Sequence, residues 1–168
     1  MELEEIIQKL HETRNELLGI LRRLDRNQIN QRKDPYSWSV GQIGQHLIKT
    51  EEIYVVAIKR GLKSNGNPKI ESKSLDLLLD RSKKLMAPDI VKPTDELFEV
   101  DEIIEKLNQS RQKLEETLSA LEDRSLLTQR HFAHPVFKEM LLIDWVRSLY
   151  LHEQRHIRQI EEIIDGLK

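Results

Sequence analysis

Four long segments of this chain repeat their apolar residues with the period of an α-helix. The segments cover about residues 2–25, 39–62, 101–121 and 142–165. Within each, apolar residues recur three or four positions apart, as they do in the first at Leu3, Ile6, Ile7, Leu10, Leu17, Leu21 and Leu24. This spacing gives each helix one apolar face that must be buried against other helices. The pattern therefore predicts an all-α fold, a four-helix bundle with long connections, built as one domain over residues 1–168.

The connections between these segments carry signals of their own. Ser39 lies three residues before Gln42, a spacing that predicts a capping box at the start of the second helix. The longest connection, residues 64–100, suits a bundle in which consecutive helices are not all antiparallel neighbours. Within it, the stretch SLDLLLDRSKKLM at 74–86 predicts one further short helix, which ends before Pro88. No segment has a convincing strand pattern, so we expect no sheet.

Composition excludes several classes of protein. The chain contains no cysteine, which rules out disulfides, thiolate metal ligands and a cysteine nucleophile. Its 27 basic and 29 acidic residues leave no basic surplus that would favour a nucleic-acid partner. The apolar runs are far too short to span a bilayer, and the N-terminal stretch MELEEIIQKL lacks the apolar core of a signal peptide. We therefore expect a cytoplasmic protein that associates with neither membranes nor nucleic acid.

Two histidines interrupt the apolar stripe of the last predicted helix. The stripe runs through Leu142, Trp145 and Leu149, and its next two members are His152 and His156. Both imidazoles stand where the pattern calls for leucine, so they face the bundle interior. A buried polar group without a partner costs about 1–3 kcal/mol, and each ring therefore needs hydrogen-bond partners or a metal ion.

The second predicted helix has a matching irregularity. His46 lies on or beside an inward line that includes Ile43 and Thr50. Three histidines from two helices, His46, His152 and His156, could therefore converge at one point. Imidazole nitrogens suit divalent zinc or nickel, and three protein ligands would leave one position open for water or substrate. The alternative is that these are core histidines whose hydrogen bonds are satisfied by neighbouring side chains.

The same residues spell the zinc-protease motif His-Glu-x-x-His, with Glu153 in the place of the general base. That interpretation fails on two counts. Such a protease needs a third ligand downstream, and only 12 residues follow His156. Glu153, one position after His152, is also turned about 100° away from it on the helix. We therefore expect a metal site of a different class.

Two segments carry a resemblance to a known family. YSWSVGQIGQHLIKTEE at 36–52 and FAHPVFKEMLLIDWVRSLYLHEQRHIRQIEEI at 132–163 resemble the signature segments of the DinB-like, or YfiT-like, metalloproteins. The resemblance implies a four-helix bundle, often a homodimer, that carries one divalent metal ion per chain on the triad of histidines identified above. One position departs from the pattern, because many relatives have glycine after the HPVF run where this chain has Lys138.

The resemblance also implies which functions to consider. The family includes thiol S-transferases that use bacillithiol or mycothiol, maleylpyruvate isomerases and metal-dependent hydrolases. We therefore expect a metal-dependent thiol S-transferase or hydrolase that acts on a small molecule, with zinc or nickel and a low-molecular-weight thiol as cofactors. The alternative is a non-catalytic protein that binds metal or a small ligand, as a sensor or in a stress response. Whether the protein is an enzyme stays open, and no catalytic residue is assigned.

Other residues admit both a functional and a structural interpretation. His131 and His134 flank a short loop stretch and are the next candidates for metal ligands, although a turn or lid role is favoured. Glu51 could support a histidine ligand or act as a general base, but a solvated or helix-pairing carboxylate is favoured. Arg155 and Arg158 could meet an anionic substrate, while surface salt bridges are the favoured use.

Overall fold

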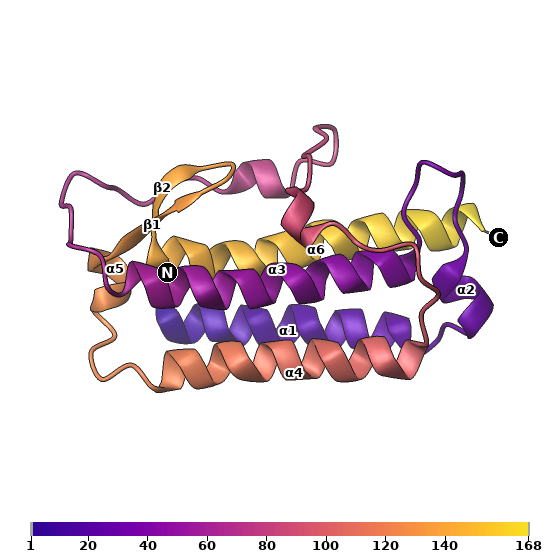
Figure 1. Ribbon diagram of the computed structural model, residues 1–168, viewed down its shortest axis with the longest axis horizontal. Coiled ribbons are helices and arrows are strands. Elements are labelled where there is room, and N and C mark those ends of the chain that lie inside the picture. The colour runs from indigo at the N-terminus through magenta and orange to yellow at the C-terminus, as the bar shows by residue number, and fades with distance from the viewer. Residues whose placement is uncertain (1, 168) are drawn as a thin grey trace.

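The four predicted helices are confirmed in the computed structural model, which describes residues 2–167 (Figure 1). They are α1 (Leu3–Leu21), α3 (Val40–Gly61), α4 (Val100–Ser119) and α6 (Leu142–Gly166). In Figure 1, α3 and α6 form one layer and α1 and α4 form the other. The colour sequence shows that α1 and α6 run in one direction while α3 and α4 run in the opposite one. The long connection after α3 thus joins two parallel helices, as its length predicts.

Capping residues account for where the helices begin and end. Ser39 accepts a hydrogen bond from the Gln42 N–H, and the Gln42 side chain accepts one from the Ser39 N–H, so the predicted capping box is present. The first helix, however, ends at Leu21 rather than near residue 25. The reason is that Asp25 caps a separate short helix, α2 (Arg26–Asn30). Aspartate is favoured at this position because its short side chain bonds the free N–H groups of the first turn.

The further helix predicted over residues 74–86 is wrong. This connection instead contains two single 3₁₀ turns, η1 (Asp76–Leu78) and η2 (Asp89–Val91). The apolar residues of the segment have helical spacing, but its backbone groups bond to partners outside a helix.

A side chain of α6 binds carbonyl groups in the segment where a helix was expected. The Arg155 guanidinium donates to the carbonyls of Leu78, Asp80 and Lys83 at 3.3, 2.9 and 2.5 Å. The Ser82 N–H, which would bond Leu78 in a helix, donates instead to the Asp80 carboxylate at 3.0 Å. The first part of residues 78–91, called the strap below, is therefore held against α6, and its end, η2, contacts α3.

A β-hairpin that the sequence did not predict lies between α4 and α6. After the short helix α5 (Leu126–Gln129), strand β1 (His131–His134) pairs antiparallel with β2 (Lys138–Leu141). Each strand has four residues, too few for an alternating pattern to stand out in the sequence. Lys138 has a φ of 60°, in the left-handed region that favours glycine.

Two apolar clusters fill the bundle interior. One contains Ile58 and Leu114, and the other contains Leu17 and Ile43, all of them fully buried. A ring of buried charge separates the two clusters, because its members lie between them in sequence on every long helix. Within residues 2–167, no helix is both long and apolar enough to cross a membrane.

The charged ring takes one side chain from each long helix, and all four are at most 6% exposed: Arg14 of α1, Glu51 of α3, Arg111 of α4 and Glu153 of α6. Arg14 bonds Glu153 at 2.7 Å and Glu51 at 3.3 Å. Arg111 bonds Glu51 at 2.8 Å and Glu153 at 3.1 Å. Burial alone would raise the pKa of Glu153, but the two arginines outweigh burial and lower it, so this carboxylate stays ionised.

Helices α1 and α4 contribute to the ring in the same way. Thr13 and Ser110 each stand beside a ring arginine in the sequence. The Thr13 hydroxyl donates to the Glu153 carboxylate at 2.8 Å, and the Ser110 hydroxyl donates to the Glu51 carboxylate at 2.6 Å. Arg14 also donates to the Leu107 carbonyl of α4, and Arg111 donates to the Leu10 carbonyl of α1, both at 2.6 Å. The sequences match accordingly, since EEIIQKLHETR at 4–14 and DEIIEKLNQSR at 101–111 share their apolar positions and final arginine.

The two ring glutamates extend this correspondence to the other helices. Glu51 on α3 and Glu153 on α6 each contact both arginines, so they occupy equivalent places. The pair α1 and α3 therefore corresponds to the pair α4 and α6 about an approximate two-fold axis through the ring. The bundle is built from two related helix pairs.

Glu153→Gln should destabilise the fold strongly, because it leaves two buried guanidinium groups with one carboxylate between them. Removing one partner of a buried ion pair costs about 3–5 kcal/mol. The measurement is the urea midpoint of unfolding at an unchanged m-value. Glu161→Gln, an exposed carboxylate on the same helix, is the matched control and should change the stability by less than about 0.5 kcal/mol. A loss in Glu153→Gln no larger than in the control would contradict the structural role of the ring.

Lys138→Gly should stabilise the protein, because it relieves a left-handed backbone conformation. A residue with a Cβ in that region costs roughly 1–2 kcal/mol, and the greater freedom of glycine in the unfolded chain offsets part of the gain. We expect a net increase of about 0.5–1 kcal/mol in the free energy of unfolding. Lys138→Ala keeps the Cβ and should bring no such increase, so equal effects of the two changes would refute this explanation.

Candidate metal centre

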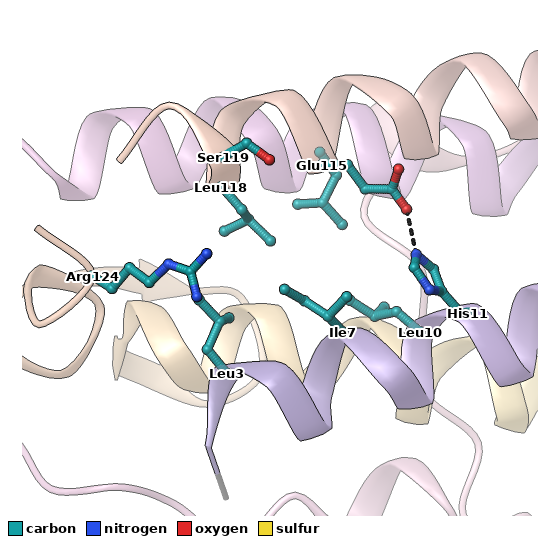
Figure 2. Close-up of a pocket in the computed structure, with 9 residues that line it drawn as sticks. Leu3, Ile7, Leu10, His11, Glu115, Leu118, Ser119 and Arg124 are labelled. Atoms are coloured by element: carbon teal, nitrogen blue, oxygen red, sulfur yellow. Dashed lines mark hydrogen bonds and ion pairs between the residues drawn. The ribbon is translucent and has the colours of Figure 1, made fainter. Parts of the chain in front are cut away.

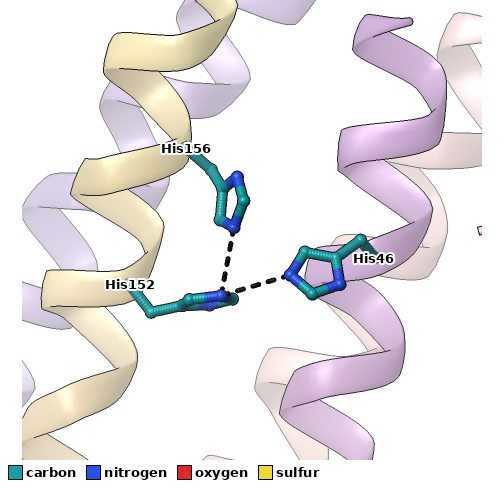
Figure 3. Close-up of side chains that lie close together, drawn as sticks. All are labelled: His46, His152 and His156. Carbon is teal, nitrogen blue, oxygen red and sulfur yellow. Dashed lines mark hydrogen bonds between the residues drawn. The ribbon is translucent and has the colours of Figure 1, made fainter. Parts of the chain in front are cut away.

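His46 of α3 meets His152 and His156 of α6 between these two helices (Figure 3). The Nε2 atom of His152 lies 3.2 Å from Nε2 of His46 and 3.1 Å from Nε2 of His156. One ligand atom from each ring lies within 4.8 Å of the other two. His46 and His156 are buried and His152 is partly buried. The structure thus brings together the three histidines that the sequence pattern singled out.

Neutral acceptors occupy the second nitrogen of two of these rings. Nδ1 of His46 lies 2.8 Å from the carbonyl oxygen of Val91, in the strap. Nδ1 of His156 lies 2.8 Å from the side-chain oxygen of Gln159, which is nearly one turn further along α6. Both oxygens only accept hydrogen bonds, so each Nδ1 carries the proton. Because a neutral imidazole has a single N–H, Nε2 of both rings presents a lone pair.

The converging lone pairs form a donor set that fits a cation. Nε2 of His152 faces both neighbours and can hold at most one proton, which satisfies only one of them. In a tetrahedral zinc site with Zn–N distances of about 2.0–2.1 Å, the ligand nitrogens lie roughly 3.3 Å apart. The separations of 3.1 and 3.2 Å seen here are close to that value. The residues present therefore fit a divalent metal ion with three imidazole ligands.

Burial keeps all three histidines neutral. It lowers the pKa of His156 to about 3, and proximity to His46 adds to the shift. It also lowers the pKa of His46, although the hydrogen bond to Val91 acts in the opposite direction. The pKa of His152 is held well below its ordinary value by burial and by its two histidine neighbours. Near neutral pH the imidazoles are thus in the protonation state that metal coordination requires.

His131 and His134 do not join this cluster. Nδ1 of His131 lies 2.7 Å from the carboxylate of Glu139. Nδ1 of His134 accepts from the Val136 N–H at 3.1 Å, so its Nε2 carries the proton and donates to the Tyr54 hydroxyl at 2.7 Å. His134 therefore shapes the hairpin turn and fastens the hairpin to α3, in agreement with the turn role favoured from the sequence.

Glu153 does not have the position of a protease general base. Its two carboxylate oxygens bond Arg14 and Arg111 in the ring, which faces α1 and α4. Glu51 bonds the same two arginines, so it pairs helices as favoured, but it is buried rather than solvated. The ring is a feature that the sequence interpretation missed. The repeated pattern LHETR at 10–14 and LNQSR at 107–111 is the signal that could have revealed it.

The prediction that Arg155 forms a surface salt bridge is wrong. Its side chain is 5% exposed and bonds carbonyl groups of the strap, as described above. Arg158 is exposed and makes a long contact of 3.4 Å to the Leu79 carbonyl.

A hollow of about 240 Å³ lies elsewhere, between α1 and α4 (Figure 2). Apolar side chains such as Leu3 and Leu118 line much of it, and His11 and Glu115 pair across one end at 2.8 Å. None of the three clustered histidines lines this hollow. The polar chemistry of the chain and its apolar hollow are therefore separate features.

Known proteins share this fold. The chain matches the DinB superfamily over residues 9–160. It is 29% identical over 157 residues to the uncharacterized protein YuaE of Bacillus subtilis (strain 168), covering 94% of this chain and 93% of that protein. The crystal structure of TT2238, described as a four-helix bundle protein, resembles it with a TM-score of 0.63 at 20% identity, over 96% of this chain and 99% of the other. Since the family match spans most of the chain and includes all three histidines, the protein belongs to the DinB superfamily.

Proposed function

We propose that this protein binds one divalent metal ion through His46, His152 and His156 and uses it to act on a small molecule. The observation that carries the proposal is the convergence of three neutral imidazoles, two of them oriented by bonds to Val91 and Gln159. Imidazole ligands favour zinc or nickel among the divalent ions. Membership of the DinB superfamily is compatible with a metal site at these positions.

The chemistry of the centre follows from its ligands and their surroundings. The ion would supply Lewis-acid chemistry, lowering the pKa of a water or thiol group at its open position. The three histidines are neutral, so they offset none of the ion's charge, which favours an anionic or readily deprotonated substrate group. The chain's own contribution is to hold His46 through the strap and His156 through Gln159, and to bury both rings.

The surroundings favour thiol transfer over hydrolysis. Hydrolysis usually draws on a side chain that takes a proton from water. Glu153, next to His152 in sequence, and Glu51, one turn and a half beyond His46, are both held by the ring arginines and are not free for that role. A thiol needs less help, because its pKa of about 8.5 is already close to neutrality. We therefore propose a metal-dependent thiol S-transferase that uses a low-molecular-weight thiol, with a metal-dependent hydrolase as the second candidate.

A non-catalytic protein that binds metal or a small ligand is the alternative from another class. The two classes differ in turnover. Metal-loaded protein mixed with a low-molecular-weight thiol and an electrophilic aryl halide should consume both reactants, and metal-free protein should not. Binding of the thiol without any consumption would favour the sensor or storage role.

Protein purified without a histidine tag should contain close to one divalent ion per chain by elemental analysis. Changing His46, His152 or His156 to alanine should remove most of it, because two imidazoles alone hold such an ion weakly. His131→Ala is the matched control, since His131 bonds within the hairpin and lies outside the cluster. Full metal content in the double variant His152→Ala, His156→Ala would place the site elsewhere and refute the proposal.

The lowered pKa values predict how the centre responds to acid. Because the folded protein holds the pKa of His156 at about 3, protons compete little for this ligand at pH 5. A free histidine, with a pKa of about 6.5, would be depleted of its neutral form about thirtyfold at that pH.

Lowered pKa values also mean that the metal-free fold loses stability as the pH falls below about 6.5, because only the unfolded chain binds the extra protons there.

We therefore expect metal content after dialysis to be the same at pH 7.5 and pH 5, and to fall only as the pH approaches the pKa of His156, about 3. Elemental analysis across that range is the measurement. Release of the ion with a midpoint near the free-histidine value of about 6.5 would contradict coordination by buried imidazoles.

A further inference from the structure

One buried hydroxyl in the bundle has no hydrogen-bond partner. The Oγ1 atom of Thr50 is buried and unpartnered within residues 2–167, and the side chain is 5% exposed. The other two such atoms, in Arg130 and Arg147, belong to guanidinium groups that bond through another nitrogen. An unsatisfied buried hydroxyl costs about 1–3 kcal/mol. Such a group points to a ligand that the chain itself does not supply.

Other hydroxyls on the long helices do not behave in this way. Thr117 donates to the Lys113 carbonyl at 2.7 Å, and Ser148 donates to the Trp145 carbonyl at 2.7 Å. This back-bonding to the preceding turn is the usual arrangement for serine and threonine inside a helix. Thr50 has the same opportunity on α3 and does not use it, so its hydroxyl is turned to another partner.

The position of Thr50 is beside the metal centre. It lies four residues after His46 and four before Tyr54, and residues four apart share one face of a helix. Both neighbours on that face contact α6: His46 contacts His152 with ring centroids 5.1 Å apart, and Tyr54 contacts Trp145 at 4.7 Å. Thr50 therefore lies in the same interface, one turn from a histidine of the centre.

The approximate two-fold axis shows at which level of the bundle Thr50 lies. Thr50 immediately precedes the ring residue Glu51, as His152 immediately precedes Glu153. Because the two glutamates occupy equivalent places in the ring, Thr50 stands on α3 where His152 stands on α6. Both residues are therefore at the level of the ring, on facing helices.

We infer that the Thr50 hydroxyl hydrogen-bonds the small molecule held at the three-histidine centre, and so selects for a ligand with an acceptor at or next to its metal-binding atom. The inference rests on the proposed function. The hydroxyl donates to an oxygen, nitrogen or sulfur acceptor of the ligand. Thiolates and carboxylates have such an acceptor, while a purely apolar ligand would leave the hydroxyl unsatisfied. Thr50 is thus a residue that determines specificity and touches the substrate.

The test uses the full chain loaded with Co²⁺, whose visible absorption reports ligand binding, and inorganic azide as the probe. Thr50→Val removes the hydroxyl at nearly constant volume, and Thr50→Ser keeps it. Thr117→Val, which removes a half-buried hydroxyl bonded to its own helix, is the matched control. We expect Thr50→Val to bind azide about tenfold more weakly, which corresponds to one hydrogen bond of about 1.4 kcal/mol. Thr50→Ser and Thr117→Val should bind azide as the unaltered protein does, and all four proteins should bind Co²⁺ equally.

A second measurement concerns the metal-free protein. There Thr50→Val should melt at a temperature no lower than the unaltered protein, because the hydroxyl has no partner to lose. A clearly lower melting temperature would show that Thr50 is already satisfied within the fold and would overturn the inference. Equal azide affinity in Thr50→Val, with Co²⁺ still bound, would also overturn it while leaving the proposed function intact. If the unaltered protein does not bind Co²⁺ at the histidines, both the inference on Thr50 and the proposed function are contradicted.

Discussion

The closed ring of Arg14, Glu51, Arg111 and Glu153 is the interaction on which the arrangement of the bundle depends. Each member comes from a different long helix and contacts both oppositely charged members, so no helix can slide by one turn without leaving buried charges unpaired. Apolar packing alone is far less selective, because one leucine can replace another along a helix face. A buried ion pair adds little net stability but strongly penalises the wrong register. We infer that the ring sets the level at which α3 and α6 face each other.

The position of α3 along α6, set by the ring, brings the histidines together. His152 adjoins a ring residue in sequence, and His46 lies five positions before the other ring glutamate. Fixing Glu51 beside Glu153 therefore also fixes the height of His46 relative to the α6 pair. The strap contributes to the arrangement through Val91, whose carbonyl group orients His46. The three histidines stay neutral, as a metal centre requires.

The two helix pairs have the same arrangement of helices but carry different residues at equivalent positions. About the approximate axis, the triad His46, His152 and His156 corresponds to Ser148, Thr50 and Tyr54. These hydroxyl groups are poor ligands for zinc or nickel, and burial raises the pKa of Tyr54 to about 12, so its phenol stays neutral. One of the two equivalent places therefore offers three imidazoles, and the other offers hydroxyls, among them the unpartnered one of Thr50. Because the two helix pairs are related in this way, the Thr50 hydroxyl lies on the helix that faces His152.

The sequence by itself determined the helices and the inward direction of the histidines, because both follow from the period of a helix and need only neighbouring residues. Ser39 with Gln42 marked a helix start for the same local reason. Only the tertiary structure decided the rest. Arginine and glutamate in a helical pattern suggest a solvated surface, and the burial of Arg14 with Glu153 depends on a contact across 139 positions of sequence. The strap does not form the helix predicted from its sequence, because the Arg155 guanidinium, about 75 residues away, binds its carbonyl groups. Local periodicity carries no information on such distant partners, and these partners decide which polar side chains are buried and what they bind.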